Sequence, residues 1–161
     1  MIRIGHAWDT HKLVKGRKLI LGGIPFDEEK GLLGHSDADV LLHSVAESLL
    51  GSLALGDLGS FYPDTIDDTL NLDSKIILKE CYQKVVAAGY KLNNLDITVY
   101  AEKIKIAPKR EIIRESIASL LKVEINQISV KATTWEQMGF IGREEAIAAE
   151  CVCLVEKEEK K

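Results

Sequence analysis

The sequence predicts a single α+β domain in which helices cover one face of a mixed β-sheet. Strand-like and helix-like segments follow one another in the order ββααβαββ, judged from β-branched content and from apolar residues at a period near 3.6. Hairpins and helical crossovers therefore occur in the same chain, which is typical of an α+β sandwich. The 161 residues, 46% of them hydrophobic, are enough to bury about two-thirds of the unfolded surface, so we expect one domain over residues 1–161.

The first elements are two strands and a helix. We expect strands over residues 2–12 and 18–22, with the glycines of "LGG" and then Pro25 breaking the second strand. A helix is expected within residues 35–55, where valines and leucines recur at helical spacing. Polar side chains at residues 36–37 could cap its start.

The middle of the chain continues with a loop, a helix and a strand. The loop at residues 56–64 is marked by glycine and proline. A second helix is expected over residues 73–88, ended by Gly89, because glycine suits the left-handed position after a helix. A β-branched strand at 93–102 leads to a third helix at 108–122, whose first residue is a proline that suits a first turn.

The last part of the chain closes the sheet. Two strands are expected, at residues 127–134 and 146–157, around a loop at 135–145. The charged end of the chain, residues 156–161, is expected to be solvated and frayed.

Composition excludes several classes of protein. A net charge of −4 and an isoelectric point near 5.6 argue against sequence-independent binding of nucleic acid, which requires a basic face. No apolar run approaches the roughly 20 residues of a membrane span, and the N-terminus does not follow the order of a signal peptide. We therefore expect a cytoplasmic protein with no membrane partner.

The three cysteines are Cys81, Cys151 and Cys153. Their number and spacing do not suit a disulfide framework. Since free cysteine prefers protein interiors, we expect all three to be buried.

The segment "GHAWDTHKL" places metal-binding side chains on a predicted strand. Successive side chains of a strand alternate faces, so Asp9 and His11 point the same way. His43, in the following helix, would alone more often be a core residue. Together the three make a His2Asp set, and three protein ligands with one open position are typical of catalytic zinc. Two histidines remain as candidates for a substrate contact or for support of a ligand: His6 and His35.

Four blocks of sequence carry a family resemblance. The blocks are "RIGHAWDTHKL", "LGGIPFDEEKGLLGHSDADVLLH", "LGDLGSFYPDT" and "VKATTWEQMGFIGREE". They resemble the 2-C-methyl-D-erythritol 2,4-cyclodiphosphate synthases of non-mevalonate isoprenoid biosynthesis over nearly the whole chain. The resemblance implies a ferredoxin-like subunit in a homotrimer with an active site at each subunit interface. It also implies a phosphorus–oxygen lyase that converts 4-diphosphocytidyl-2-C-methyl-D-erythritol 2-phosphate to the cyclic diphosphate and CMP.

The resemblance also implies two metal ions in each active site. One zinc per subunit would be held by Asp9, His11 and His43, and a magnesium or manganese ion by Glu136. The reaction joins two anionic groups, and two unit charges 4 Å apart repel by about 4 kcal/mol at an effective dielectric near 20. Because the chain is acidic overall, local cations must offset this repulsion.

By resemblance, three residues take catalytic roles: Thr134, His35 and Glu136. A larger set is implied to bind the phosphates, the methylerythritol hydroxyls, the cytidine and an isoprenoid diphosphate on the trimer axis. Taken alone, Ser36 is equally a helix cap, Asp57 a turn residue and Arg143 a surface residue. The set is Asp9, His11, His35, Ser36, Asp57, Gly59, Phe61, Tyr62, Pro63, Asp64, Ala101, Lys105, Ile106, Ala107, Thr133, Thr134, Glu136, Phe140 and Arg143.

Four positions depart from the family pattern. Ile104 stands at a proline position, which removes a constraint on φ. Glu47 stands where aspartate is common, and it would need a longer reach to orient a ligand histidine. Trp135 replaces a small polar residue, and Glu144 replaces a glycine.

Two other functions remain open at this stage. One is a non-catalytic trimer that binds zinc and a cytidine nucleotide. The other is a zinc-dependent phosphohydrolase that activates water with the same His2Asp set. Retention of Thr134 and Glu136 beside the zinc ligands favours the synthase.

Overall fold

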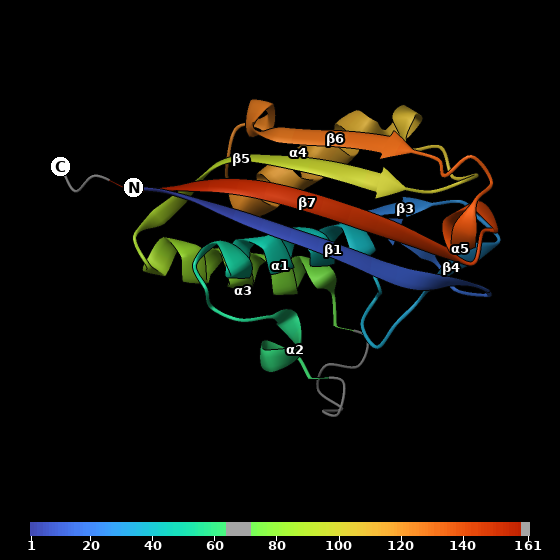
Figure 1. The fold of residues 1–161 in the computed structure, drawn as a ribbon, viewed down its shortest axis with the longest axis horizontal. Helices are drawn as coiled ribbons and strands as arrows, with labels where there is room; N and C mark the ends of the chain where they lie inside the picture. The colour runs from blue at the N-terminus through green and yellow to red at the C-terminus, as the bar shows by residue number, and fades with distance from the viewer. Residues whose placement is uncertain (64–71, 159–161) are drawn as a thin grey trace.

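The computed structural model describes residues 1–63 and 72–158, which form one mixed five-stranded sheet, a small hairpin and several helices. The strands of the sheet lie in the order β4-β1-β7-β5-β6 (Figure 1). The pairs β1/β4, β1/β7 and β5/β7 are antiparallel, and β5/β6 is parallel. The bounds are β1 Ile2–Lys15, β4 Lys30–Leu33, β5 Tyr90–Tyr100, β6 Ile128–Thr133 and β7 Ala146–Lys157.

The helices α1, α3 and α4 pack on one face of this sheet (Figure 1). Helix α1 crosses β1 and β7, α3 packs on α1, and α4 packs on β6. The prediction of an α+β fold with helices on one face of a mixed sheet is confirmed. The three helices are α1 Val40–Ser52, α3 Ser74–Ala87 and α4 Arg110–Leu121. The remaining elements are short: α2 Leu58–Phe61, α5 Gly139–Gly142, η2 Ala107–Lys109, η3 Ile125–Gln127, β2 Leu19–Leu21 and β3 Ile24–Phe26.

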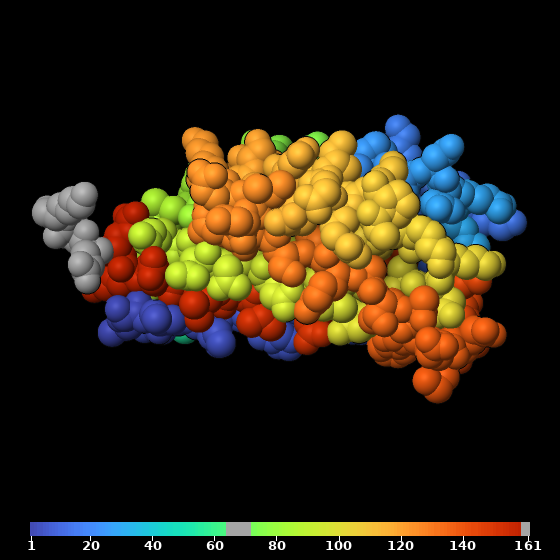
Figure 2. All heavy atoms as spheres, turned by 90° about the horizontal axis from the view of Figure 1, so that it is seen from above, coloured from blue at the N-terminus to red at the C-terminus, as the bar shows by residue number. Residues whose placement is uncertain are grey.

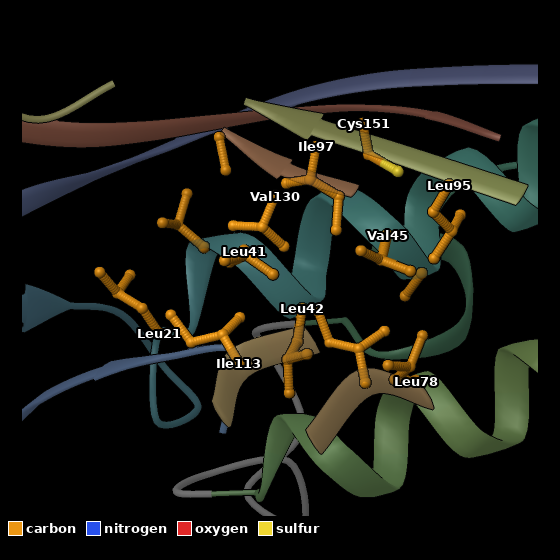
Figure 3. Packing of buried hydrophobic residues seen from close by; sticks show 14 of the residues in the cluster. Leu21, Leu41, Leu42, Val45, Leu78, Leu95, Ile97, Ile113, Val130 and Cys151 are labelled. Carbon is orange, nitrogen blue, oxygen red and sulfur yellow. The ribbon is translucent and has the colours of Figure 1, made fainter. Parts of the chain in front are cut away.

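The core lies between the sheet and the helices. Figure 3 shows Leu41 and Val45 of α1 close to Ile97 of β5 and Cys151 of β7, all of them fully buried. All three cysteines are free and buried, as expected. Gly5 allows α1 to approach the sheet, since a Cβ there would lie 1.9 Å from a backbone oxygen of the helix. This close approach lets the second half of α1, at Ser48, pack directly on β1.

Helix α1 begins later than the sequence suggested, at Val40. The prediction that residues 36–37 cap it was wrong, because the cap is Asp39, whose Oδ1 accepts the N–H of Leu42 at 3.0 Å. Ala38 has a φ of +57°, so the chain cannot be helical before the cap. His43 therefore lies in the first turn of α1, next to the loop.

Two short strands were missed. Pro25 was expected to end a strand, but it lies within β3. Among the described residues, β3 pairs only with β2, in a separate two-stranded hairpin. An edge position tolerates proline because its missing N–H is not needed by a neighbour. β4 extends the sheet beyond β1, and its four residues are too few for a periodic pattern.

Other expected boundaries hold. Helix α3 ends at Ala87, and Gly89 has a φ of +79° as its position required. Pro108 lies in the turn η2 that leads into α4. Within the described ranges, no helix is long and apolar enough to cross a membrane. Residues 159–161 of the charged tail lie outside the described residues, and β7 extends to Lys157.

Candidate metal centre and active-site pocket

Asp9, His11 and His43 form a compact group that could hold a metal ion. One ligand atom from each lies within 4.8 Å of the others. His11 Nε2 is 3.1 Å from Asp9 Oδ2 and 3.2 Å from His43 Nδ1, and His43 Nδ1 is 3.4 Å from the same Asp9 oxygen. The three side chains expected from the sequence are thus brought together, and their free atoms converge on one point.

The two elements that carry these ligands explain their convergence. In β1, Asp9 and His11 share the face that Ala7 and Leu13 bury against the helices. His11 Nδ1 lies 3.0 Å from the carbonyl of Leu33 in β4, so an Nδ1–H can donate there and leave Nε2 free as a ligand atom. His43 reaches the same place from the first turn of α1.

The electrostatics of the group favour a charged carboxylate. Burial by itself raises the pKa of Asp9, but hydrogen bonds and charge interactions with His11 and His43 outweigh it and bring that pKa well below its usual range. Burial lowers the pKa of His11, and the hydrogen bond and charge of Asp9 more than reverse this, so that its pKa is raised. An anionic oxygen beside two imidazoles is the donor set that zinc accepts readily.

A pocket of about 480 Å³ opens beside the metal group. Its lining includes the three candidate metal ligands and, from the loop before α1, His35 and Ser36. It also includes Gly59 and Tyr62, from the segment expected to bind the methylerythritol hydroxyls. The full lining is Trp8, Asp9, His11, Gly34, His35, Ser36, His43, Glu47, Leu58, Gly59, Tyr62, Leu72 and Ile77. A site with three metal ligands at one wall and polar groups around it can bind a phosphorylated small molecule.

Other members of the 57–64 segment support the wall. Asp57 caps α2, since its Oδ1 accepts the N–H of Ser60 at 2.8 Å and the Ser60 hydroxyl at 2.6 Å. Phe61 packs its ring 4.4 Å from the ammonium group of Lys84. Pro63 lies at the end of a described segment, and Asp64 lies outside the described residues.

Glu47 holds α2. Its Oε2 accepts the N–H of Leu58 at 2.8 Å, so its carboxylate anchors the start of that helix and is not committed to a ligand histidine. Burial is the main cause of its raised pKa. The longer side chain at this position thus has a structural use.

His6 does not support the metal group. It lies on the opposite face of β1 from Asp9, where its Nε2 is 2.8 Å from Oε1 of Glu150 on β7. Tyr100 donates to the other oxygen of Glu150 at 2.5 Å. Of the two histidines left open by the sequence, the structure places His35 in the lining of the pocket and His6 in a pair with Glu150.

A second group of predicted residues lies at the far edge of the sheet. The segment 101–107 and the segment 133–145 lie next to each other at one end of the molecule (Figure 2, yellow and orange). Ala101 and Ile106 are buried, while Lys105, Ala107 and Thr133 are exposed. Thr134 Oγ1 accepts the N–H of Glu136 at 3.4 Å.

Glu102 joins the two segments, and sequence reasoning missed it. Its carboxylate accepts the N–H of Trp135 at 3.1 Å and that of Gln137 at 3.0 Å, on both sides of Glu136. Glu136 and Gln137 have φ values of +52° and +64°, which are costly for residues with a Cβ. The sequence carries no signal for this left-handed pair, because neither residue is a glycine.

The residues implied to line the trimer axis lie in the same region. Phe140 packs against Trp135 at a ring distance of 5.4 Å. Arg143 is exposed and pairs with Glu145 at 2.8 Å. Glu144 has a φ of +57°, the conformation for which glycine is suited, and it pairs with Lys103 at 2.8 Å.

The two groups remain apart within one chain. The pocket lining contains no residue of 101–107 or 133–143 among those described. β6 is three strands from β1, a separation of about 14 Å at the usual strand spacing. Moreover, the two groups lie on opposite faces of the sheet. Val130 of β6 is buried against the helices, so Thr133, three residues later, points to the other face, whereas Asp9 faces the helices.

Comparisons with known proteins identify the family of the chain. The model of the YgbB family matches residues 2–156. The chain belongs to the YgbB family. A relative from Geobacillus sp. strain WCH70, called 2-C-methyl-D-erythritol 2,4-cyclodiphosphate synthase, is 52% identical over 157 residues, which cover 98% of this chain and 99% of the relative.

Solved structures agree with this family assignment. The bifunctional IspDF of Campylobacter jejuni matches 99% of the chain with a TM-score of 0.95 and 38% identity, and the match spans 43% of that longer protein. IspF of Plasmodium falciparum, solved as a CDP complex, matches 98% of the chain and 97% of its own length, with a TM-score of 0.87 and 33% identity. The family resemblance seen in the sequence is confirmed.

Proposed function

We propose that the chain is a 2-C-methyl-D-erythritol 2,4-cyclodiphosphate synthase, which converts 4-diphosphocytidyl-2-C-methyl-D-erythritol 2-phosphate to the cyclic diphosphate and CMP. The carrying observation is the convergence of Asp9, His11 and His43 beside a pocket. It occurs in a chain that is 52% identical to curated synthases along nearly its whole length. The product is an intermediate of isoprenoid biosynthesis.

The donor set supports zinc as the first metal. Two imidazole nitrogens and a carboxylate oxygen would hold a zinc ion through three protein ligands, which is the number found in catalytic zinc sites. Zinc bound there would supply a positive charge that draws electron density from a phosphate oxygen. Asp9, His11 and His43 would hold it, about one ion per chain.

Chain groups around the metal would position the reacting phosphates. His35 and Ser36 line the pocket beside the ligands, where a histidine and a hydroxyl can donate hydrogen bonds to a phosphate. Gly59 and Tyr62 line its other side, where the methylerythritol part would lie. Holding both phosphates in line makes the reaction a positioned intramolecular step.

The nucleotide side would come from a second copy of the chain. Thr133, Thr134, Glu136 and the segment 101–107 do not line the metal pocket of their own chain, so a complete site requires a neighbour. Glu136 would hold magnesium or manganese at the diphosphate, and Thr134 would stabilise charge there. The CDP complex of the Plasmodium falciparum relative supports a cytidine nucleotide as the ligand of such a site.

A homotrimer would supply that neighbour. The sheet face turned away from the helices exposes Ile2, Ile4, Trp8 and Val152 by 64, 66, 43 and 39%. An exposed apolar face of this kind marks an association surface, and cyclic symmetry would place one site at each subunit contact. Phe140 and Arg143 would then lie toward the axis, where an isoprenoid diphosphate could bind.

The function is tested by incubating the protein with the diphosphocytidyl 2-phosphate substrate, zinc and magnesium, and following phosphorus NMR. The synthase gives a cyclic diphosphate and CMP. A phosphohydrolase would release inorganic phosphate or an open diphosphate, and a binding protein would leave the substrate intact. Either outcome would reject the proposal, and His43→Ala should abolish the product in parallel with zinc content.

A further inference from the structure

A hydrogen-bonded chain of side chains runs behind the metal group from His43 to Asp37. His43 Nδ1 faces the ligand atoms of His11 and Asp9, and Nε2 lies 2.8 Å from the hydroxyl of Ser74. The Ser74 hydroxyl bonds Asp37 Oδ1, and the Ser74 N–H donates to Asp37 Oδ2 at 3.2 Å. Both oxygens of Asp37 are therefore engaged by one serine.

The chemistry of these groups fixes the direction of the chain. A carboxylate only accepts hydrogen bonds, so the hydroxyl of Ser74 must donate its proton to Asp37. The lone pair of the serine oxygen is then the acceptor for His43, whose Nε2 must carry a hydrogen. In the neutral ring this leaves Nδ1 unprotonated, with its lone pair toward Asp9 and His11, as a metal ligand requires.

Burial and helix geometry hold the chain in place. Ser74 is fully buried and is the first residue of α3, where backbone N–H groups lack partners within the helix. Asp37 supplies that partner, and its own N–H donates to the carbonyl of Leu72 at 3.3 Å. The start of α3 is thus tied to the loop that precedes α1.

Ser36 is a second, more distant hydrogen-bond partner for Nε2 of His43. Its Oγ lies 3.2 Å from His43 Nε2 but already accepts the N–H of Ala38 at 3.1 Å. No carboxylate bond to the Ser36 hydroxyl compels it to act as an acceptor among the described contacts. Ser74 is therefore the partner that determines which nitrogen of His43 is protonated.

We propose that Ser74 and Asp37 are positioning residues that hold His43 in the Nε2-protonated form and thereby set the affinity of the site for zinc. The inference rests on the proposed zinc site and adds two residues from outside the pocket's ligand set. Outer partners of this kind change metal affinity by about 10- to 100-fold when removed. Ser74→Ala should weaken zinc binding within that range.

Zinc affinity is measured by competition between metal-free protein and a chromophoric chelator. Ser74→Thr keeps a hydroxyl and should retain most of the affinity, whereas Asp37→Asn can donate to the serine and should weaken binding less than Ser74→Ala. The matched control is Ser52→Ala, which removes a buried hydroxyl of α1 that lies nine residues beyond His43 and donates to the carbonyl of Leu49 at 2.7 Å. It should bind zinc as tightly as the unmodified chain.

The protonation of His43 gives a readout that does not depend on metal. Nitrogen-15 spectra of metal-free protein, labelled at its four histidines, separate the two tautomers, and His43→Ala identifies the signal. The unmodified chain should show His43 protonated at Nε2, and Ser74→Ala should show a mixture. If Ser74→Ala proves too unstable for titration, the test is the proton on Nε2 of His43, which should be present in the unmodified chain and partly lost in Asp37→Asn.

The outcomes separate the two ideas. The inference fails if folded Ser74→Ala binds zinc within about threefold of the unmodified chain, or if His43 of the unmodified chain is protonated at Nδ1 and carries no proton at Nε2. If the unmodified chain binds zinc no better than His43→Ala does, the zinc site of the proposed function fails instead. The tautomer measurement still decides the inference in that case.

Discussion

At the scale of single residues, Asp39 does more than cap a helix. It is fully buried, and its carboxylate accepts N–H groups from Gly22 and Gly23 at 3.0 and 2.7 Å as well as from Leu42. One side chain thus fixes the turn between β2 and β3 to the start of α1. Since His43 follows one turn later, Asp39 also helps to position this candidate metal ligand.

We predict that Asp39→Ala lowers the free energy of unfolding by about 2 to 4 kcal/mol, because a cap is lost and two buried N–H groups are left without an acceptor. Urea denaturation of metal-free protein, at one protein concentration, measures this. Asp73→Ala is the control, since Asp73 caps α3 at a half-buried position through Lys75 and should cost about 1 kcal/mol. Equal losses in the two variants would contradict the bridging role of Asp39.

Glu144 carries backbone strain that a glycine would remove. Its left-handed φ of +57° costs a residue with a Cβ about 1 kcal/mol, whereas its pair with Lys103, which is 77% exposed, is screened by solvent and offsets only part of that cost. Glu144→Gly should therefore raise the free energy of unfolding by about 0.5 kcal/mol. Lys103→Ala removes the pair without relieving the strain, and Glu144→Gly proving less stable than Lys103→Ala would refute the account.

Single residues also show what sequence can and cannot reveal. Asp9 and His11 were predictable because strand alternation fixes their common face, and His43 because the helix follows nearby. Ser74 and Glu102 were not, because each acts through a contact across more than 30 residues that no local pattern encodes. Family resemblance supplied the second group of residues, which periodicity alone does not single out.

At the scale of elements, long periodic segments were predicted well and short ones were not. The helices α3 and α4 and the strands β5 and β7 lie close to their expected bounds. The strands β3 and β4 and the helices α2 and α5 have only three or four residues each, and tertiary contacts select them. The start of α1 moved because the buried bonds of Asp39 outweigh the local capping choices at residues 36–37.

The loop after β6 is bonded to the 101–107 segment by the carboxylate of Glu102. We predict that Glu102→Ala weakens the binding of CDP in the presence of magnesium by about 5- to 10-fold, because loss of two charged-acceptor bonds frees the left-handed pair at 136–137. Calorimetric titration measures this. Glu115→Ala, at an exposed position on α4, should leave the affinity unchanged. An unchanged affinity in Glu102→Ala would show that the loop holds its conformation without Glu102.

At the scale of the whole molecule, the sheet separates the two groups of predicted site residues. The candidate metal group lies against the helices, whereas Thr133 is on the other face at the far edge. Under the proposed function, one chain would supply a metal side and a nucleotide side to two different sites. The central claim is that a working synthase site combines the metal side of one copy with the nucleotide side of the next.

Coexpression of His43→Ala and Glu136→Ala chains at equal levels tests this claim most directly. Each variant alone should be inactive. In random trimers a shared site is intact when its metal side comes from a Glu136→Ala chain and its nucleotide side from a His43→Ala chain, each with a chance of one half. About a quarter of the sites should then form the cyclic diphosphate, by this symmetry argument. Activity no higher than in either variant alone, with mixed trimers verified by native mass spectrometry, would contradict the shared site.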